Sequence, residues 1–253
     1  MKFAFLVFLL LAAGPAQAAS IEDIFSLYAQ GDYEQAAQAG QASHSAPGLA
    51  IAARAVLADE VLRDAPCLSC LERAESLARA AIAADKHFAY GHIWLAVALG
   101  YEARVIGMLR ARLKDLPNQS KQALDAAIAA DPKNAYAVSA LGGWHIEIVR
   151  GGGATLARVL YDARESQALA LFDQAVKFAP ENVAVHYQIA LALAGFDAEK
   201  YRPRVVCELK MATSNIARTA YEKRIQARAS EQLGLMNDAD AFEAKLNRYQ
   251  GFP

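Results

Sequence analysis

The sequence predicts an all-α fold, built as a solenoid of antiparallel helix pairs. Hydrophobic residues make up 55% of the chain, alanine dominates them, and β-branched runs are few, which favours helices over strands. Three segments of similar sequence end at Lys86, Pro132 and Pro180. A segment that recurs in this way is typical of a helical repeat protein.

Each repeat is expected to hold a helix A, a helix B and a stop. The array is expected to fill residues 19–253 with about five helix pairs. A first pair is predicted around a turn at Gly31, Asp32 and Tyr33, and a last pair at residues 217–233 and 238–248. Between them, B helices are predicted to end at the three stops, and A helices are predicted at residues 89–103, 135–150 and 183–194.

The B helices carry small and large residues at a fixed spacing. The spacing is seen in full at Ala168, Phe172, Ala175 and Pro180. Residues 120–132 keep it with Ser120 in the small position, and residues 74–86 keep it with Ala78 in place of the large residue. The chain thereby resembles the tetratricopeptide repeat (TPR) family. The resemblance implies a right-handed superhelical array in which small residues let neighbouring helices approach closely.

The repeats are longer than those of that family. The stops lie 46 and 48 residues apart, against about 34 in the family, and the surplus falls in two inserts, residues 105–119 and 151–166. Inserts at equivalent places map to one face of a solenoid, often the binding face. With the string at residues 141–150, these inserts look more loosely like the regulator of microtubule dynamics family. Some members of that family bind and move phospholipids, which implies a lipid ligand as one possibility.

The N-terminus resembles a secretory signal. Lys2 precedes an apolar run over residues 3–13, then Gly14 and Pro15, then a small-residue triplet that predicts cleavage after Ala18. The alternative is a membrane anchor, but the run is shorter than the roughly 20 residues that span a bilayer. We therefore expect a periplasmic or secreted protein that is not an integral membrane protein. Its near-neutral charge, without a basic cluster, argues against a nucleic-acid partner.

The concave face of such an array is lined mainly by the A helices. Positions counted from Ala89, Ala135 and Val183 place tyrosines and small or apolar residues there, which suits an apolar ligand, an amphipathic helix or a peptide. The Lys and Arg that grip acidic peptide tails in TPR relatives are missing from it. Alternatively, the inserts fill this face. The residues expected to bind a ligand or partner are Tyr90, Ile93, Val97, Tyr101, Arg104, Tyr136, Gly143, Trp144, Glu147, Arg150 and Tyr187.

Arg104 and Arg150 occupy equivalent positions at the ends of two A helices. A cation there interacts favourably with the helix dipole in any protein. A sharper hypothesis is that both face a shared cavity and bind a phosphate or carboxylate. The ligand's tail would then lie on insert residues, namely Val105, Ile106, Leu109, Leu156 and Leu160.

Other residues of potential chemical interest favour structural roles. Cys67 and Cys70 are expected to form a disulfide in an oxidising compartment, with a bond to Cys207 or a redox role as alternatives. The histidines are scattered, so no metal site is predicted. The Gly151 to Gly153 run lacks the ending of a phosphate-binding loop and is expected to end a helix.

No nucleophile sits in a recognised motif, so neither an enzyme nor a cofactor is predicted. The leading hypothesis is a non-enzymatic periplasmic scaffold that binds a protein partner, such as an envelope or transporter component, in its concave groove. The alternative is a carrier that holds a lipid-like or hydrophobic small ligand between the groove and the inserts.

Overall fold

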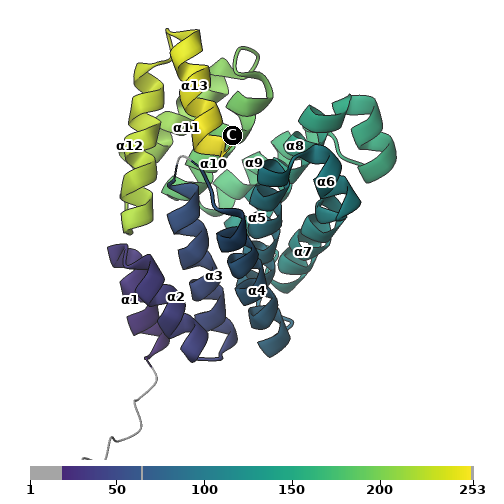
Figure 1. The fold of residues 1–253 in the computed structure, drawn as a ribbon. Coiled ribbons are helices and arrows are strands. Elements are labelled where there is room, and N and C mark those ends of the chain that lie inside the picture. Colours follow the sequence, from purple (N-terminus) through teal and green to yellow (C-terminus); the bar gives the residue numbers. More distant parts are fainter. Residues whose placement is uncertain (1–18, 64, 252–253) are drawn as a thin grey trace, which may run out of the picture.

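A computed structural model describes residues 19–63 and 65–251, and Figure 1 shows its course. The predicted signal segment, residues 1–18, lies outside the described residues. Every regular element within them is a helix, which confirms the all-α prediction. The helices are α1 (Ile21–Gln30), α2 (Tyr33–Ala42), α3 (Ala46–Val61), α4 (Leu68–Ala84), α5 (Ala89–Ile106), α6 (Met108–Leu113), α7 (Leu116–Ala130), α8 (Ala135–Tyr161), α9 (Glu165–Phe178), α10 (Val183–Asp197), α11 (Arg202–Ser214), α12 (Ala220–Gly234) and α13 (Ala239–Gln250).

The described helices form a solenoid of six pairs with one short extra helix. The pairs are α1/α2, α3/α4, α5/α7, α8/α9, α10/α11 and α12/α13, with α6 inserted between α5 and α7. Three helices, α3, α6 and α11, are additional to those predicted. α3 packs against α2, α4 and α5 and is buried around most of its circumference, so its sequence lacks the polar face that reveals a surface helix.

Short polar side chains start several of the helices that line the interior of the array. The Asn134 side chain accepts hydrogen bonds from the backbone N–H groups of Tyr136 and Ala137 at the start of α8. Asn182 accepts one from Val185 at the start of α10. These caps satisfy backbone donors that have no partner within the helix. They set where the two helices begin, and each cap lies two positions before the first residue that lines the interior, Tyr136 or Ala184.

The small and large residues of the repeat pattern pack as the spacing predicts. Ala168, Phe172 and Ala175 are buried on α9, and Phe172 lies against Gly142 of α8. A Cβ atom at Gly142 would lie only 2.6 Å from Phe172 Cε1. The absence of a side chain at Gly142 therefore lets α8 and α9 approach closely.

The two inserts have different structures. The first forms α6, which begins after Gly107 in a positive-φ conformation. The second is a continuation of α8, which runs to Tyr161 with a kink at Gly153, where φ is 73°. The prediction that the glycine run ends helix A with a positive φ is confirmed at Gly153, whose backbone is not helical, and a second helical segment follows it. Only Gly153 takes a positive φ, and the helical hydrogen-bonding pattern resumes beyond it.

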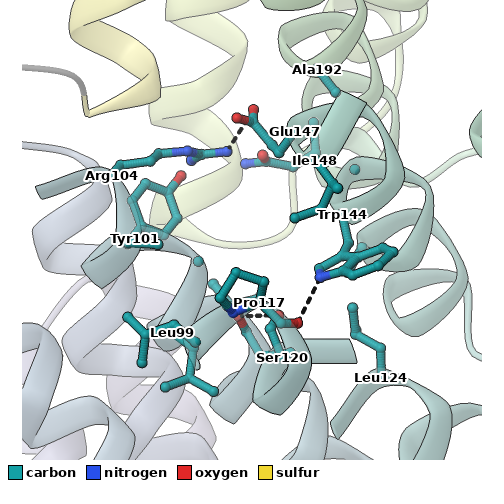
Figure 2. A pocket seen from close by; sticks show the side chains of 18 of the residues that line it. Leu99, Tyr101, Arg104, Pro117, Ser120, Leu124, Trp144, Glu147, Ile148 and Ala192 are labelled. Carbon is teal, nitrogen blue, oxygen red and sulfur yellow. Dashed lines mark hydrogen bonds and ion pairs between the residues drawn. The ribbon is translucent and has the colours of Figure 1, made fainter. Parts of the chain in front are cut away.

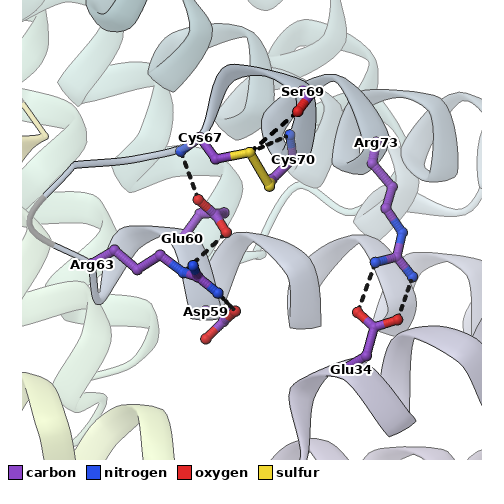
Figure 3. The surroundings of a disulfide bond; sticks show 8 residues. All are labelled: Glu34, Asp59, Glu60, Arg63, Cys67, Ser69, Cys70 and Arg73. Carbon is purple, nitrogen blue, oxygen red and sulfur yellow. Dashed lines mark hydrogen bonds and ion pairs between the residues drawn. A yellow bond between two sulfur atoms is a disulfide. The ribbon is translucent and has the colours of Figure 1, made fainter.

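The disulfide lies at the corner between α3 and α4 (Figure 3). Cys67 caps α4 and is bonded to Cys70. The buried Glu60 carboxylate on α3 accepts a hydrogen bond from the Cys67 backbone N–H at 2.8 Å and pairs with Arg63 at 3.2 Å. The third cysteine, Cys207, is free and exposed.

The C-terminal helices return to the start of the array. In Figure 1, one end of α12 comes close to α1, and α13 contacts α10. The buried Arg228 of α12 donates hydrogen bonds to the carbonyl oxygens of Val61 at 2.8 Å and Leu62 at 2.7 Å. Gln250 of α13 donates one to the carbonyl of Leu191 at 2.7 Å. The concave face is consequently covered on this side by the protein's own last helix pair.

Candidate functional site

The inner faces of α3, α5, α8 and α10 surround a cavity of about 830 Å³. Tyr221 of α12 and Gln250 at the end of α13 contribute to its wall, and residues of α6 and of the second half of α8 line its other end. Figure 2 shows part of this cavity. Its volume falls in the range of roughly 300 to 1,000 Å³ that is usual for small-ligand sites. We refer to it as the central pocket.

Most of the predicted binding residues lie around the central pocket. Those in its lining are Ile93, Val97, Tyr101, Arg104, Tyr136, Gly143, Trp144, Glu147 and Arg150. The other two lie elsewhere. Tyr90 stacks beside Trp94, with ring centroids 6.3 Å apart, outside the lining. Tyr187 is fully buried in the core, and this burial raises the pKa of its phenol far above the usual value.

One end of the central pocket holds an arginine among aromatic rings. The guanidinium carbon of Arg54, on α3, lies 4.4 Å from the ring centroid of Tyr28, 5.3 Å from that of Trp94 and 5.7 Å from that of Tyr136. Within residues 19–63 and 65–251, no carboxylate lies within ion-pairing distance of Arg54, and its guanidinium donates no hydrogen bond. Attraction to the rings offsets part of the free-energy cost of removing this cation from water. The rings do not accept the hydrogen bonds that its N–H groups can donate.

Arg54 is the residue that sequence reasoning missed. The expectation that the inner face lacks basic side chains is wrong at this position, because Arg54 lies on α3, a helix that was not predicted. A single arginine within an alanine-rich segment, residues 46–58, is the feature that would have drawn attention to it. A long cation that is half-buried in an apolar helix is unusual.

A polar group lies further along the same pocket. Arg104 pairs with Glu147 at 3.1 Å and donates a hydrogen bond to the Gln250 carbonyl at 3.3 Å. Arg150 donates one to the Gln250 side chain at 3.2 Å and lies 3.7 Å from Glu147. Arg104 and Arg150 thus face a shared cavity, as hypothesised, but both bind groups of the protein itself. Burial opposes the charge of Arg104, and Glu147 raises its pKa above the usual value.

Trp144 forms part of the pocket wall between the two ends. Its indole N–H donates a hydrogen bond to the Pro117 carbonyl at 2.9 Å, and the Ser120 hydroxyl donates one to the Ala96 carbonyl at 3.2 Å (Figure 2). These bonds tie the start of α7 to α8 and α5. They hold the large Trp144 ring in one orientation, so this part of the pocket wall is fixed.

The comparisons with known proteins give a family. The model of the regulator of microtubule dynamics protein 1-3 family matches residues 48–237, which extend from the start of α3 past the end of α12. This chain belongs to that family. A search of curated proteins found no match. The looser of the two resemblances is therefore confirmed, whereas membership of an exported bacterial TPR group stays a prediction.

The segment that matches the family contains most of the residues that line the central pocket. Arg54, Arg104 and Arg150 all lie inside the matched segment, and Tyr28 and Gln250 lie outside it. The helical solenoid of the family is an architecture compatible with a protein-binding scaffold. Across the described residues, no helix has both the length and the apolar character that crossing a membrane requires.

The described residues contain one group of possible metal ligands, Glu60 with Cys67 and Cys70, whose ligand atoms lie within 4.8 Å of one another. Two of these three residues are joined as the disulfide. A thiolate ligand requires a free sulfur, so the group is not a metal site in this state. The central pocket is thus the strongest candidate site in this family member.

Proposed function

We propose that the protein is a non-enzymatic binding protein that encloses an anionic amphiphile in the central pocket. The ligand has one carboxylate or phosphate group and an apolar tail, as in a fatty acid or a lysophospholipid. The observation that carries the proposal is Arg54, a half-buried cation in an apolar, aromatic pocket with no carboxylate within ion-pairing distance among the described residues. Cations removed from water are normally paired, and a ligand anion would complete this one.

The shape of the pocket supports the tail of such a ligand. Trp94, near Arg54, and Arg104 are ten residues apart on α5, which corresponds to about 15 Å along the helix axis. Apolar side chains, among them Ile93, Val97 and Leu191, lie along the wall. An anion at Arg54 therefore leaves room for a tail that runs toward α6, where apolar burial stabilises it.

The cover over one side of the pocket favours a small ligand over a peptide. The α12/α13 pair contacts α1, α3 and α10, and Gln250 lies across the ends of Arg104 and Arg150. This cover restricts the room for an extended chain along the concave face. A single-chain amphiphile needs only one opening.

Arg54→Met tests this function because methionine keeps a long apolar side chain and removes the charge. We expect the variant to bind a dansyl-labelled fatty acid at least about tenfold more weakly than the unmodified protein, since a charge-assisted hydrogen bond contributes about 1.5 to 3 kcal/mol. Affinity is read from dansyl fluorescence in a titration. Arg73→Met is the matched control, because Arg73 pairs with Glu34 on the surface at 2.7 Å.

A neutral analogue separates the charge from the shape of the site. A dansyl-labelled fatty alcohol of the same length should bind the protein and the Arg54→Met variant equally. Equal affinity of both proteins for the fatty acid would contradict the role of Arg54. Failure of the unmodified protein to bind either probe would contradict the function itself.

The location of this function is proposed to be the periplasm or the exterior of the cell. Two features support this, the signal-like segment that ends at Ala18 and the Cys67–Cys70 disulfide, since disulfides persist in oxidising compartments. N-terminal sequencing of the mature protein tests it. A sequence that starts at Ala19 supports export, and one that starts at Met1 contradicts it.

A scaffold for a protein partner is the second candidate function. The helical solenoid of the family favours it, as does a group of exposed apolar side chains on α6 and α8. Ligand extraction distinguishes the two candidates, because a scaffold purifies without a stoichiometric small molecule.

A further inference from the structure

The inserts carry a concentrated group of exposed apolar side chains. They lie on α6 and on the second half of α8. The two segments are in contact at Met108 and Gly151, since a Cβ atom added at Gly151 would lie 3.2 Å from Met108 Sδ. Residues 107–115 and 151–164 form what we call the insert tip. Its large apolar side chains, 47 to 80% exposed, are Met108, Leu109, Leu113, Leu156, Val159 and Leu160. Elsewhere in the described chain, large exposed apolar side chains are isolated, at Phe25 and Ile216.

The insert tip is also basic. It contains five Lys or Arg residues and two aspartates, whereas the whole chain has a formal net charge of −1. One of the aspartates, Asp162, is paired with Arg164 at 2.6 Å. The cations Arg110, Lys114 and Arg158 are exposed among the apolar side chains. A surface with exposed apolar and basic side chains complements a surface that has an apolar interior beneath negatively charged groups.

The insert tip surrounds one end of the central pocket. Met108, Leu156 and Leu160 are exposed and also line the pocket. Leu109, Leu113 and Val159 are exposed and do not line it. In Figure 1, α6 and the far part of α8 lie together on the side of the array away from α1 and α12. The pocket and the exposed apolar surface are therefore continuous.

We propose that the insert tip docks on the surface of an anionic lipid bilayer, and that the central pocket exchanges its ligand there. The second part rests on the proposed function. Apolar side chains of an interfacial segment enter the boundary between headgroups and acyl chains, while Lys and Arg bind the anionic headgroups. The large exposed apolar area on a monomer is then explained, because it is covered when the protein is docked.

Vesicle sedimentation tests the docking. The full chain should pellet with vesicles of phosphatidylcholine containing phosphatidylglycerol, and remain in solution with vesicles of phosphatidylcholine alone. The triple variant Leu109→Ser, Leu113→Ser, Val159→Ser should lower the partition coefficient for the anionic vesicles at least about tenfold, because each substitution removes apolar burial in the interface. Ile216→Ser is the matched control and should pellet as the unmodified protein does.

The charge component is tested by Arg110→Gln with Arg158→Gln. This double variant should bind anionic vesicles more weakly and with less dependence on salt concentration. The reason is that salt screens the attraction between these two cations and the headgroups, and the variant lacks that attraction. Lys210→Gln with Lys223→Gln, on α11 and α12, removes the same charge from other exposed positions and should change neither property. Equal effects of the two double variants would mean that net charge alone matters and would overturn docking through the tip.

Different variants test membrane docking and ligand binding, so the two proposals can be contradicted independently. The triple variant should still bind the dansyl-labelled fatty acid in solution, because its three residues do not line the pocket. Arg54→Met should still pellet with anionic vesicles. Undiminished vesicle binding by the triple variant would overturn the proposal, and so would no vesicle binding by the unmodified protein. A concentration-dependent dimer that the triple variant abolishes, without vesicle binding, would assign the tip to a second copy of the chain.

Discussion

Glu102 on α5 is a buried acid with acidic neighbours. It is 2% exposed, and one of its carboxylate oxygens has no hydrogen-bond partner among the described residues. Burial first, and then Glu75 and Glu72 on α4, raise its pKa to about 7. In the unfolded chain the pKa of a glutamate is about 4.3. The native state therefore resists the ionisation of Glu102.

Glu102→Gln should consequently stabilise the protein in a pH-dependent way. The native state loses stability as pH rises from about 4.3 to about 7, because the unfolded chain ionises first, and the loss is constant above that range. The gain from the substitution should be small at pH 5 and reach about 2 to 3 kcal/mol at pH 8. Urea unfolding at the two pH values measures it, with the exposed Glu243→Gln as control. A gain independent of pH would contradict the raised pKa.

The site residues on α5 and α8 were predictable one by one, whereas Arg54 was not. Ile93, Val97 and Gly143 follow from the helical period once the repeat is recognised, because position along a helix determines which side chain faces inward. Tyr187 shows the limit of that rule. Its side chain lies in the core and does not line the pocket.

At the scale of elements, close packing of α8 on α9 depends on Gly142. Gly142→Ala should destabilise the protein by about 1 to 3 kcal/mol, because the added Cβ would clash with Phe172. Gly143→Ala is the matched control, since no atom lies within 4 Å of a Cβ there, and it should be neutral or stabilise by up to about 1 kcal/mol. Thermal unfolding compares the two. Similar melting temperatures for both variants would contradict the assigned contact.

The repeated helices were predictable because their pattern is local. Small and large residues a few positions apart specify α4, α7 and α9, and the stop residues separate them. α11 was not predicted, because a charge interrupts its apolar stripe. That charge, Glu208, is buried and hydrogen-bonded to His186 and Arg204, so its place in the core depends on partners that are distant in sequence.

At the scale of the whole molecule, closure of the array depends on contacts between its two ends. Arg228 reaches the carbonyls of Val61 and Leu62 across more than 160 residues of sequence. No local period encodes such a contact, so the sequence did not predict that the last helix pair covers one side of the concave face. The predicted ligand alternative gains support from this closure.

Arg228→Met should weaken the closure. It removes the hydrogen bonds that the Val61 and Leu62 carbonyls accept from Arg228, and we expect a loss of roughly 2 to 4 kcal/mol. Urea unfolding measures the loss, and amide hydrogen exchange should show faster exchange at the end of α3 and in α12. Arg224→Met, at an exposed position of the same helix, should leave both unchanged. Equal stability of the two variants would show that Arg228 does not hold the ends together.

The central claim is that the central pocket holds one anionic amphiphile. Native mass spectrometry of the purified protein, followed by denaturing extraction, tests it most directly. We predict one ligand molecule per chain, with a carboxylate or phosphate group, released on denaturation and absent from Arg54→Met. A protein that purifies without a ligand, and that takes up none from a mixture of fatty acids and lysophospholipids, would contradict the claim.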